Sequence, residues 1–366
     1  MAVENGKLYT TIVLQGGGAL GAYEYGVLKA LYKARPGFKP AAVAGISIGA
    51  VTAAVLGGSK DPIEALKRLW QDKLTVAAPL PIIGPMDRSL ANFGNPGMYR
   101  LNAELFTAPW ASTSIYDTAP LRRTLAQLVD PALLNDKGTR VVVGATNAGT
   151  GEINFFDSYQ PGGLTFEHVV ASGSLPPSFP MTQIDGESYW DGGLFSNTPL
   201  SPAINALEEA AEGDSSAVLE LIVIELFSMN AAIPADMSDV LQRIVQLQYT
   251  SRLKLDQKFF DKIDKSVEVM AQINVALPKD SPIRENQMYR DMCAHRKINH
   301  FNVVTSSFPS LLSNAGDFSR SSIDARIQAG YDDAIAQGIG RIDSEGLRSG
   351  ITSEAARRAT SAVPVA

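Results

Sequence analysis

The first third of the chain alternates short apolar runs with stretches in which apolar residues recur every three or four positions. A short apolar run is typical of a buried strand, and the three-to-four spacing is typical of an amphipathic helix. The pattern predicts a strand at residues 8–14, a helix at 19–33, a strand at 41–44 and helices at 50–56 and 62–73. Strands that alternate with helices in this way indicate an α/β fold built in layers.

The same signals return later in the chain, after one long interruption. They predict helices at residues 120–128, 165–171, 239–270 and 319–337, strands at 140–146, 153–156, 219–226 and 301–305, and a hairpin turn at Asp185-Gly186. The helix at 239–270 has an apolar stripe for packing on a core or for contact with a membrane or a partner, and its interleaved Arg and Lys residues favour core packing. Residues 346–366 are rich in Ala, Ser and Arg, and we expect a mobile tail there.

The interruption covers residues 74–117, where prolines and glycines recur without a sustained period. So long an irregular connection is a lid or binding loop over a site, or an irregular surface excursion. Met98, Tyr99, Phe106 and Trp110 lie within it. These side chains would either line an acyl pocket or form a separate apolar cluster under a loop.

Composition narrows the classes of function. The 366 residues are 45% hydrophobic and 19% charged, as in an ordinary globular protein, and suit two domains or one large α/β domain. A formal net charge of −6 does not resemble the basic footprint of nucleic-acid binding. The single cysteine, Cys293, excludes internal disulfides, and the polar start shows no secretory signal. The apolar run 41–58 is interrupted and short for a bilayer span, so we expect a cytoplasmic or peripherally membrane-associated protein.

Gly45-Ile46-Ser47-Ile48-Gly49 is the first motif that carries chemistry. It is a GxSxG sequence between a predicted strand and a helix of small residues. A serine that attacks a carbonyl must stand exposed on a sharp strand-to-helix turn, and Gly45 and Gly49 allow that turn without Cβ clashes. The pattern makes Ser47 a candidate nucleophile.

A glycine-rich loop follows the first strand. Gly16-Gly17-Gly18-Ala19-Leu20-Gly21 also matches the GxGxxG pattern of dinucleotide sites. Such a site needs a carboxylate at the end of the second strand, and the sequence has Ala44-Gly45 there. The alternative use is an oxyanion hole, in which N–H groups of Gly16, Gly17 and Gly18, together with that of Ile48, hold a developing negative charge.

Asp191-Gly192-Gly193 is the third motif. By itself it indicates a turn, since Asp and Gly are turn formers. Together with Ser47 it offers a carboxylate on a loop that permits close approach. A free Asp has a pKa of about 3.9, so a base at this position needs burial that raises its pKa and a hydrogen bond to the serine.

In this order the three motifs resemble those of the patatin-like phospholipase family. The matching stretches are QGGGALGAYEYGVL, GISIG and WDGGLFSNTP, and ASGSLPPSFP resembles the segment that precedes the family's aspartate. Residues 317–331 are similar to the C-terminal extension of a bacterial subgroup. The resemblance implies a three-layer α/β/α fold with a central, mainly parallel sheet, a long insertion and a helical C-terminal extension.

The resemblance also implies a function and a division of the chain. It implies a lipid acyl hydrolase, of phospholipase A or lysophospholipase type, with a dyad of Ser47 and Asp191, an oxyanion hole, and no metal or cofactor. Residues 8–207 would be the catalytic core, with 74–117 as insertion, and 208–340 would complete the same domain. Gly45, Gly49, Gly192 and Gly193 would support the motifs.

Alternatives stay open at this point. A carboxylesterase or thioesterase on soluble acyl esters would use the same residues, and a lipid-binding regulatory protein would keep the fold with little catalysis. A Ser–Asp–His triad would use His295 or His300, which follow Ser47 and Asp191 in the required order. These two histidines precede the last predicted strand, whereas a triad histidine is expected on a loop after such a strand. Headgroup, chain length and oligomeric state are not encoded in any pattern that we find.

Overall fold

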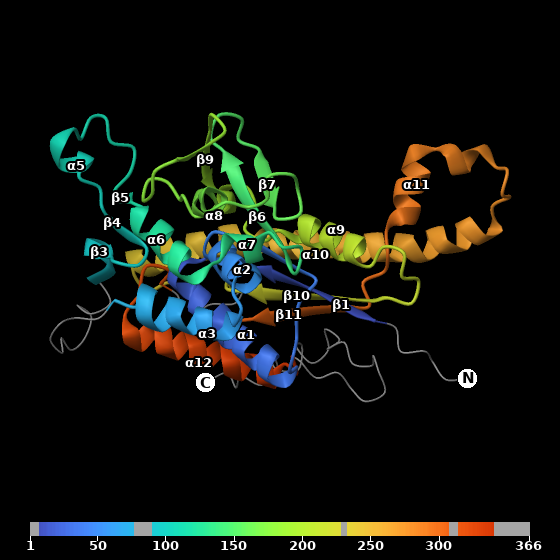
Figure 1. The fold of residues 1–366 in the computed structure, drawn as a ribbon, viewed down its shortest axis with the longest axis horizontal. Coiled ribbons are helices and arrows are strands. Elements are labelled where there is room, and N and C mark those ends of the chain that lie inside the picture. Colours follow the sequence, from blue (N-terminus) through green and yellow to red (C-terminus); the bar gives the residue numbers. More distant parts are fainter. Residues whose placement is uncertain (1–6, 77–89, 228–232, 307–313, 340–366) are drawn as a thin grey trace.

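The structure is a computed structural model that describes residues 7–76, 90–227, 233–306 and 314–339 (Figure 1). Its centre is an eight-stranded sheet in the order β11-β10-β1-β2-β6-β9-β8, with β7 also paired to β6. Neighbours from β11 to β6 run parallel, and the pairs β6–β7, β6–β9 and β8–β9 are antiparallel. The α/β class with a mainly parallel sheet is thereby confirmed.

The sheet strands are β1 (Leu8–Leu14), β2 (Ala42–Ile46), β6 (Arg140–Asn147), β7 (Ile153–Asp157), β8 (Thr182–Ile184), β9 (Glu187–Asp191), β10 (Val218–Glu225) and β11 (His300–Thr305). The helices of the body are α1 (Ala22–Ala34), α2 (Ile48–Gly58), α3 (Pro62–Lys67), α6 (Ala119–Leu128), α7 (Pro131–Leu134), α8 (Phe166–Ser172), α9 (Leu200–Ala210), α10 (Met237–Ala276), α11 (Gln287–Ala294) and α12 (Arg320–Ala336). A 3₁₀ turn (Gly18–Gly21) precedes α1, and a π-helical turn (Arg68–Leu74) follows α3.

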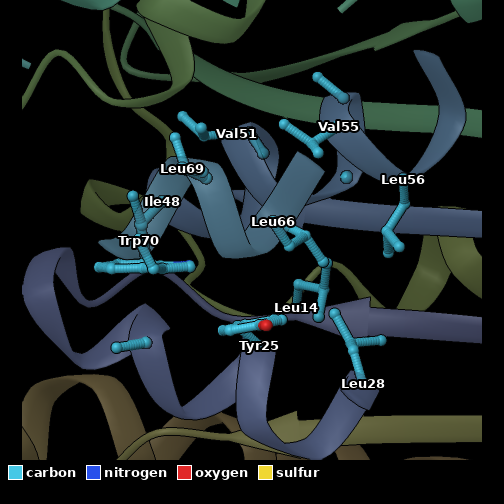
Figure 2. Close-up of a cluster of buried hydrophobic side chains, with 14 of the residues drawn as sticks. Leu14, Tyr25, Leu28, Ile48, Val51, Val55, Leu56, Leu66, Leu69 and Trp70 are labelled. Atoms are coloured by element: carbon cyan, nitrogen blue, oxygen red, sulfur yellow. The ribbon is translucent and has the colours of Figure 1, made fainter. Parts of the chain in front are cut away.

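Alternate residues of the central strands face opposite layers of helices. In β1, Ile12 and Leu14 belong to the larger core with α1, α2 and α12, whereas Val13 belongs to the core under α9. Figure 2 shows part of the larger core, where Leu14 lies among side chains of α1, α2, α3 and the π-helical turn. Dense packing of this kind fixes the backbone of β1, β2 and α2, and therefore the turns between them.

Most predicted elements are present, with ends shifted by one to a few residues. The sequence patterns did not predict α7, α9 or α11 as helices. The π-helical turn replaces the second half of the helix predicted at 62–73. In α10, Val240, Ile244 and Leu247 are more than a third exposed, so this part of the predicted stripe is not a fully buried core face. The side chains of Leu241 and Val245, and the predicted tail 346–366, lie outside the described residues.

The segment predicted to be irregular, residues 74–117, contains a small three-stranded sheet where it is described. Its elements are β3 (Gly94–Asn95), β4 (Tyr99–Leu101), α5 (Glu104–Thr107) and β5 (Tyr116–Asp117). Met98 and Tyr99 are buried in the main core, but Phe106 and Trp110 are exposed. The expectation that all four line one pocket or one cluster is therefore wrong, because the two halves of the segment have opposite environments. Residues 77–89 lie outside the described part.

Candidate active site

Ser47 lies on the turn between β2 and α2, with a backbone φ of +55°. A non-glycine residue rarely adopts this left-handed conformation, and such strain is common at nucleophile turns. The two flanking glycines are required by close backbone approach. A Cβ on Gly45 would collide with the carbonyl of Gly49, and a Cβ on Gly49 would lie 2.6 Å from the carbonyl oxygen of Leu14. The strained turn presents the Ser47 side chain at the carboxyl end of β2.

Asp191 reaches the same place because β6 changes its partner there. Ile46, the last residue of β2, pairs with Gly144 of β6. The next residue of β6, Ala145, pairs instead with Asp191 at the end of β9. The ends of β2 and β9 therefore meet side by side along β6. This register brings Ser47 and Asp191 together although they are far apart in the sequence.

The Asp191 carboxyl is almost fully buried, with 3% of the residue exposed. Burial raises its pKa to about 7, against hydrogen bonds from the Ser47 side chain and the Gly193 N–H, which lower the pKa. The Gly193 N–H donates to Asp191 Oδ1 at 2.7 Å. A carboxyl in this environment holds its proton to near-neutral pH and is a far stronger base than a solvated Asp once ionised.

Asn197 holds the glycine loop through two hydrogen bonds to one residue. The Gly16 N–H donates to Asn197 Oδ1 at 3.0 Å, and Asn197 Nδ2 donates to the Gly16 carbonyl at 2.9 Å. The Gly16 N–H is therefore already engaged within the protein. Among the described residues, no hydrogen bond is formed by the N–H of Gly17 or Gly18. These two donors lie in the loop that packs against the Ser47 turn.

Gln15 ties the start of the same loop to two other segments. Its Nε2 donates to Thr198 Oγ1 at 2.7 Å, and its Oε1 accepts from the N–H of Leu226 at 2.9 Å. All three residues are buried. Hydrogen bonds between buried groups are costly to break, so the loop is held in one position relative to the segments after β9 and β10.

The segment that resembles the family's ASGSLPP stretch joins the two candidate catalytic residues. The N–H of Ser47 donates to Ser172 Oγ at 3.0 Å, and the N–H of Asp191 donates to the Ser174 carbonyl at 3.0 Å. One short segment at the end of α8 thus accepts the backbone N–H of both residues. Sequence reasoning noted the segment but did not assign this role to Ser172.

Two further residues near the site were not found from the sequence. The Tyr249 ring of α10 packs on Phe227, with centroids 5.1 Å apart, and borders Gly193. Burial and the neighbouring Asp191 carboxyl raise the pKa of Tyr249 to about 12. Arg326 of α12 is fully buried, and donates to the carbonyls of Asn314, Asp317 and Ala19. Tyr249 belongs to no motif, and Arg326 lies in the stretch 317–331, to which the sequence assigned no residue role. Only the tertiary fold brings the two residues to the site.

The three histidines lie elsewhere. His300 begins β11 and is level with Glu220 near the start of β10, whereas Ser47 follows the opposite end of β2. The register places His300 level with Ala41, the residue before β2, so it separates His300 from Ser47 by about 20 Å along the strands and about 14 Å across them. His295 pairs with Glu208 at 3.3 Å, and His168 stacks on Phe156. The structure therefore assembles no Ser–Asp–His triad from these residues.

Two features are absent from the described part of the chain. No group of three or more His, Cys, Asp or Glu side chains there is arranged to hold a metal ion. No helix there is long and apolar enough to cross a membrane.

Comparison with known proteins matches this part of the chain to one family. The family model described as Patatin-like phospholipase matches residues 12–204, just over half of the chain, which confirms the resemblance drawn from the motifs. That range includes the glycine loop, the Ser47 turn and Asp191. No curated protein sequence matches the chain.

Solved structures from two bacteria align with most of the chain. VipD from Legionella pneumophila aligns with a TM-score of 0.40 and 14% identity, over 91% of this chain and 66% of that chain. The chain thus spans slightly less than two thirds of VipD. The complex of ExoU with SpcU from Pseudomonas aeruginosa aligns with a TM-score of 0.31 and 13% identity, over 89% of this chain and 77% of that chain.

Proposed function

The chain belongs to the patatin-like phospholipase family, and we propose that it is a serine lipid acyl hydrolase of phospholipase A or lysophospholipase type. The observation that carries the proposal is the junction on β6, where the ends of β2 and β9 bring a strained serine and a buried carboxyl together. Ser47 is the nucleophile and Asp191 its base.

The reaction has two halves that use the same pair. Ser47 Oγ attacks the ester carbonyl carbon while its proton passes to the Asp191 carboxylate. The tetrahedral intermediate collapses, the bond to the leaving alcohol breaks, and that alcohol takes the proton from Asp191. Water then gives a proton to Asp191 and attacks the acyl-enzyme carbonyl. As the second tetrahedral intermediate collapses, the bond to Ser47 Oγ breaks, Asp191 returns the proton to Ser47 Oγ, and the fatty acid leaves.

The raised pKa of Asp191 makes this assignment chemically reasonable without histidine. A base works best when its pKa lies near the working pH, and burial brings the pKa of Asp191 to about 7. The Gly193 N–H keeps one carboxyl oxygen engaged, which fixes the orientation of the group while the other oxygen is left for proton transfer.

The oxyanion hole in this proposal uses the N–H groups of Gly17, Gly18 and Ile48. Ile48 is the first residue of α2, where N–H groups point out of the helix start. Gly16 has a positioning role instead, since its N–H already donates to Asn197. One oxyanion donor typically contributes about 2.7–4 kcal/mol to transition-state stabilisation, so the placement of this loop is as important as the dyad.

We also propose that residues 208–340 complete the catalytic domain rather than form a second one. In support, β10 and β11 extend the central sheet beyond β1. The Ala315 carbonyl accepts the N–H of Ala19 at 2.8 Å, and a Cβ on Gly18, whose φ is +54°, would lie 2.6 Å from that carbonyl oxygen. The glycine loop therefore packs directly on a segment near the C-terminal helix.

A hydrolysis panel tests the proposed function. Phosphatidylcholine vesicles, lysophosphatidylcholine and p-nitrophenyl esters of graded chain length would be compared with wild-type protein and Ser47→Ala. We expect release of fatty acid from the phospholipids that Ser47→Ala abolishes. Hydrolysis of short soluble esters alone would favour a carboxylesterase, and no hydrolysis of any ester would overturn the enzyme assignment.

A further inference from the structure

The insertion between the π-helical turn and α6 carries two large aromatic side chains into solvent. We call residues 94–117 the arm and residues 103–113 its tip. Phe106 is 76% exposed and Trp110 is 85% exposed. Figure 1 shows α5, which contains Phe106, at the far end of the molecule and away from the helices of the body. Single exposed apolar residues are common, but Trp and Phe exposed to this degree on one short tip are not.

The tip is ordered by its own hydrogen bonds. Asn102 Nδ2 donates to Ser112 Oγ at 3.1 Å, and Asn102 Oδ1 accepts the N–H of Glu104 at 3.0 Å. The N–H of Asn102 donates to the carbonyl of Ile115 across the base of the tip. Asn102 therefore closes the loop on both sides, so the fold itself presents the two aromatic rings to solvent.

The root of the arm is attached to the segment that holds the candidate catalytic residues. The N–H groups of Ile115 and Tyr116 donate to the carbonyls of Pro177 and Ser178. Tyr99, Tyr116 and Phe179 pack together, with ring centroids 4.7–5.9 Å apart. Pro177 follows closely on Ser172–Ser174, which accept the N–H groups of Ser47 and Asp191. The arm thus projects from the border of the site.

The turn after Asp191 adds apolar surface at the same border. Leu194 and Phe195 follow Gly193 directly, and both are more than 40% exposed. A second group of exposed side chains lies on the far side of the molecule, around α11, and includes Met288 and Val275. That group is aliphatic and is interleaved with Arg284 and Arg290. The segment after α11 is held at the amino edge of the sheet, away from Ser47, because the N–H of Arg296 donates to the Glu208 carboxylate.

We propose that the tip of the arm is an interfacial anchor that inserts Phe106 and Trp110 into a zwitterionic phospholipid surface and holds the site against it. The inference rests on the proposed function, which supplies a lipid substrate. Trp and Phe favour the boundary between headgroups and acyl chains, where an apolar ring leaves water. The tip favours neutral headgroups, because Glu104 is the only charged residue between Asn102 and Ile115. A chain with a net charge of −6 gains nothing from an anionic surface.

Binding to vesicles tests the anchor without catalysis. Ser47→Ala protein would be floated with phosphatidylcholine vesicles, with and without Phe106→Ser and Trp110→Ser. Removing each ring is expected to weaken binding about tenfold. Met288→Ser with Val275→Ser is the matched control, with two exposed apolar side chains far from the site, and should change binding less than twofold. Equal losses in both pairs, or no loss in the arm pair, would overturn the proposal.

Fluorescence locates the contact through Trp110, because of the three tryptophans Trp70 is buried, Trp190 is only partly exposed and Trp110 is 85% exposed. Phosphatidylcholine vesicles should shift the emission to the blue, and Trp110→Phe should remove most of that shift. Binding that requires phosphatidylserine would contradict a charge-poor anchor. A dimer that the arm substitutions dissociate in sedimentation would instead make the tip a contact between two copies of the chain.

Activity separates the two proposals. The arm pair should hydrolyse a short p-nitrophenyl ester within twofold of wild type and phosphatidylcholine vesicles at least tenfold more slowly. Equal rates on vesicles would overturn the anchor and leave the proposed function intact. A wild-type protein that binds vesicles but hydrolyses neither substrate would overturn the proposed function and leave the anchor intact.

Discussion

The buried Asp191 carboxyl predicts that activity and stability change in opposite directions with pH. Asp191→Asn is the perturbation, since the amide is close in shape and can still accept the Gly193 N–H. In wild type, burial raises the pKa of Asp191 to about 7, whereas an unfolded Asp has a pKa of about 3.9. The Asp191 carboxyl therefore keeps its proton to higher pH in the folded state than in the unfolded state.

The size of the stability effect follows from this difference in pKa. Asp191 contributes about 4 kcal/mol to the free energy of unfolding. This contribution is fully present below about pH 3.9 and is lost as the pH rises through about 7. Between pH 5 and pH 8 the loss is about 2.5 kcal/mol. Because the side chain is almost fully buried, solvent screening reduces this figure little. Asp191→Asn cannot ionise, so it should gain that amount relative to wild type over this interval.

Urea unfolding of both proteins at pH 5 and pH 8 measures this change, and the difference between pH values cancels effects of the substitution that do not depend on pH. Asp280→Asn is the control, because it removes an exposed carboxylate in the segment that follows α10. In wild type, kcat/KM should rise about tenfold per pH unit below 7 and level off above it. The argument would be refuted if Asp191→Asn gained less than about 0.5 kcal/mol in free energy of unfolding relative to wild type between pH 5 and pH 8. A rise of kcat/KM centred near pH 4 would also refute it.

The remaining predictions concern the loop, the C-terminal helix and the histidines. Asn197→Ala should lower kcat ten- to hundredfold with little change in KM, because Gly16 loses both of its hydrogen bonds to Asn197 and the oxyanion donors shift. Steady-state kinetics checks this prediction, and an unchanged kcat would contradict it. Arg326→Met should lower the free energy of unfolding by about 3 kcal/mol in urea, since buried carbonyls lose their donor, and a loss below about 1 kcal/mol would count against that role. His295→Ala and His300→Ala should keep esterase turnover within twofold of wild type. A loss as large as that of Ser47→Ala would instead support a Ser–Asp–His triad.

The parts of the fold that follow from local pattern were predictable. β1 was placed at its observed ends, because a short apolar run between polar residues is a strong signal for a buried strand. The need for Gly45 and Gly49 follows from the turn itself. The π-helical turn was missed because its apolar spacing resembles that of an ordinary helix. The helix α9 was missed although its sequence is rich in Ala, Leu and Glu and buries one apolar face.

The site could be predicted in its residue types but not in its geometry. The meeting of Ser47 with Asp191 depends on β6 changing partner between Gly144 and Ala145, which is a matter of long-range register. The engagement of the Gly16 N–H by Asn197 is likewise a tertiary contact. The exposure of Trp110 had no sequence signal, because the same residue in a proline-rich segment could equally have been buried.

Covalent labelling of Ser47 tests the central claim most directly. Folded protein would be treated with a fluorophosphonate, digested, and examined by mass spectrometry, beside Asp191→Asn and urea-unfolded protein. The account predicts one adduct, on the peptide that carries Ser47, that is strongly reduced in Asp191→Asn and absent after unfolding. Folded protein that takes no label, or that is labelled at another serine, would contradict it.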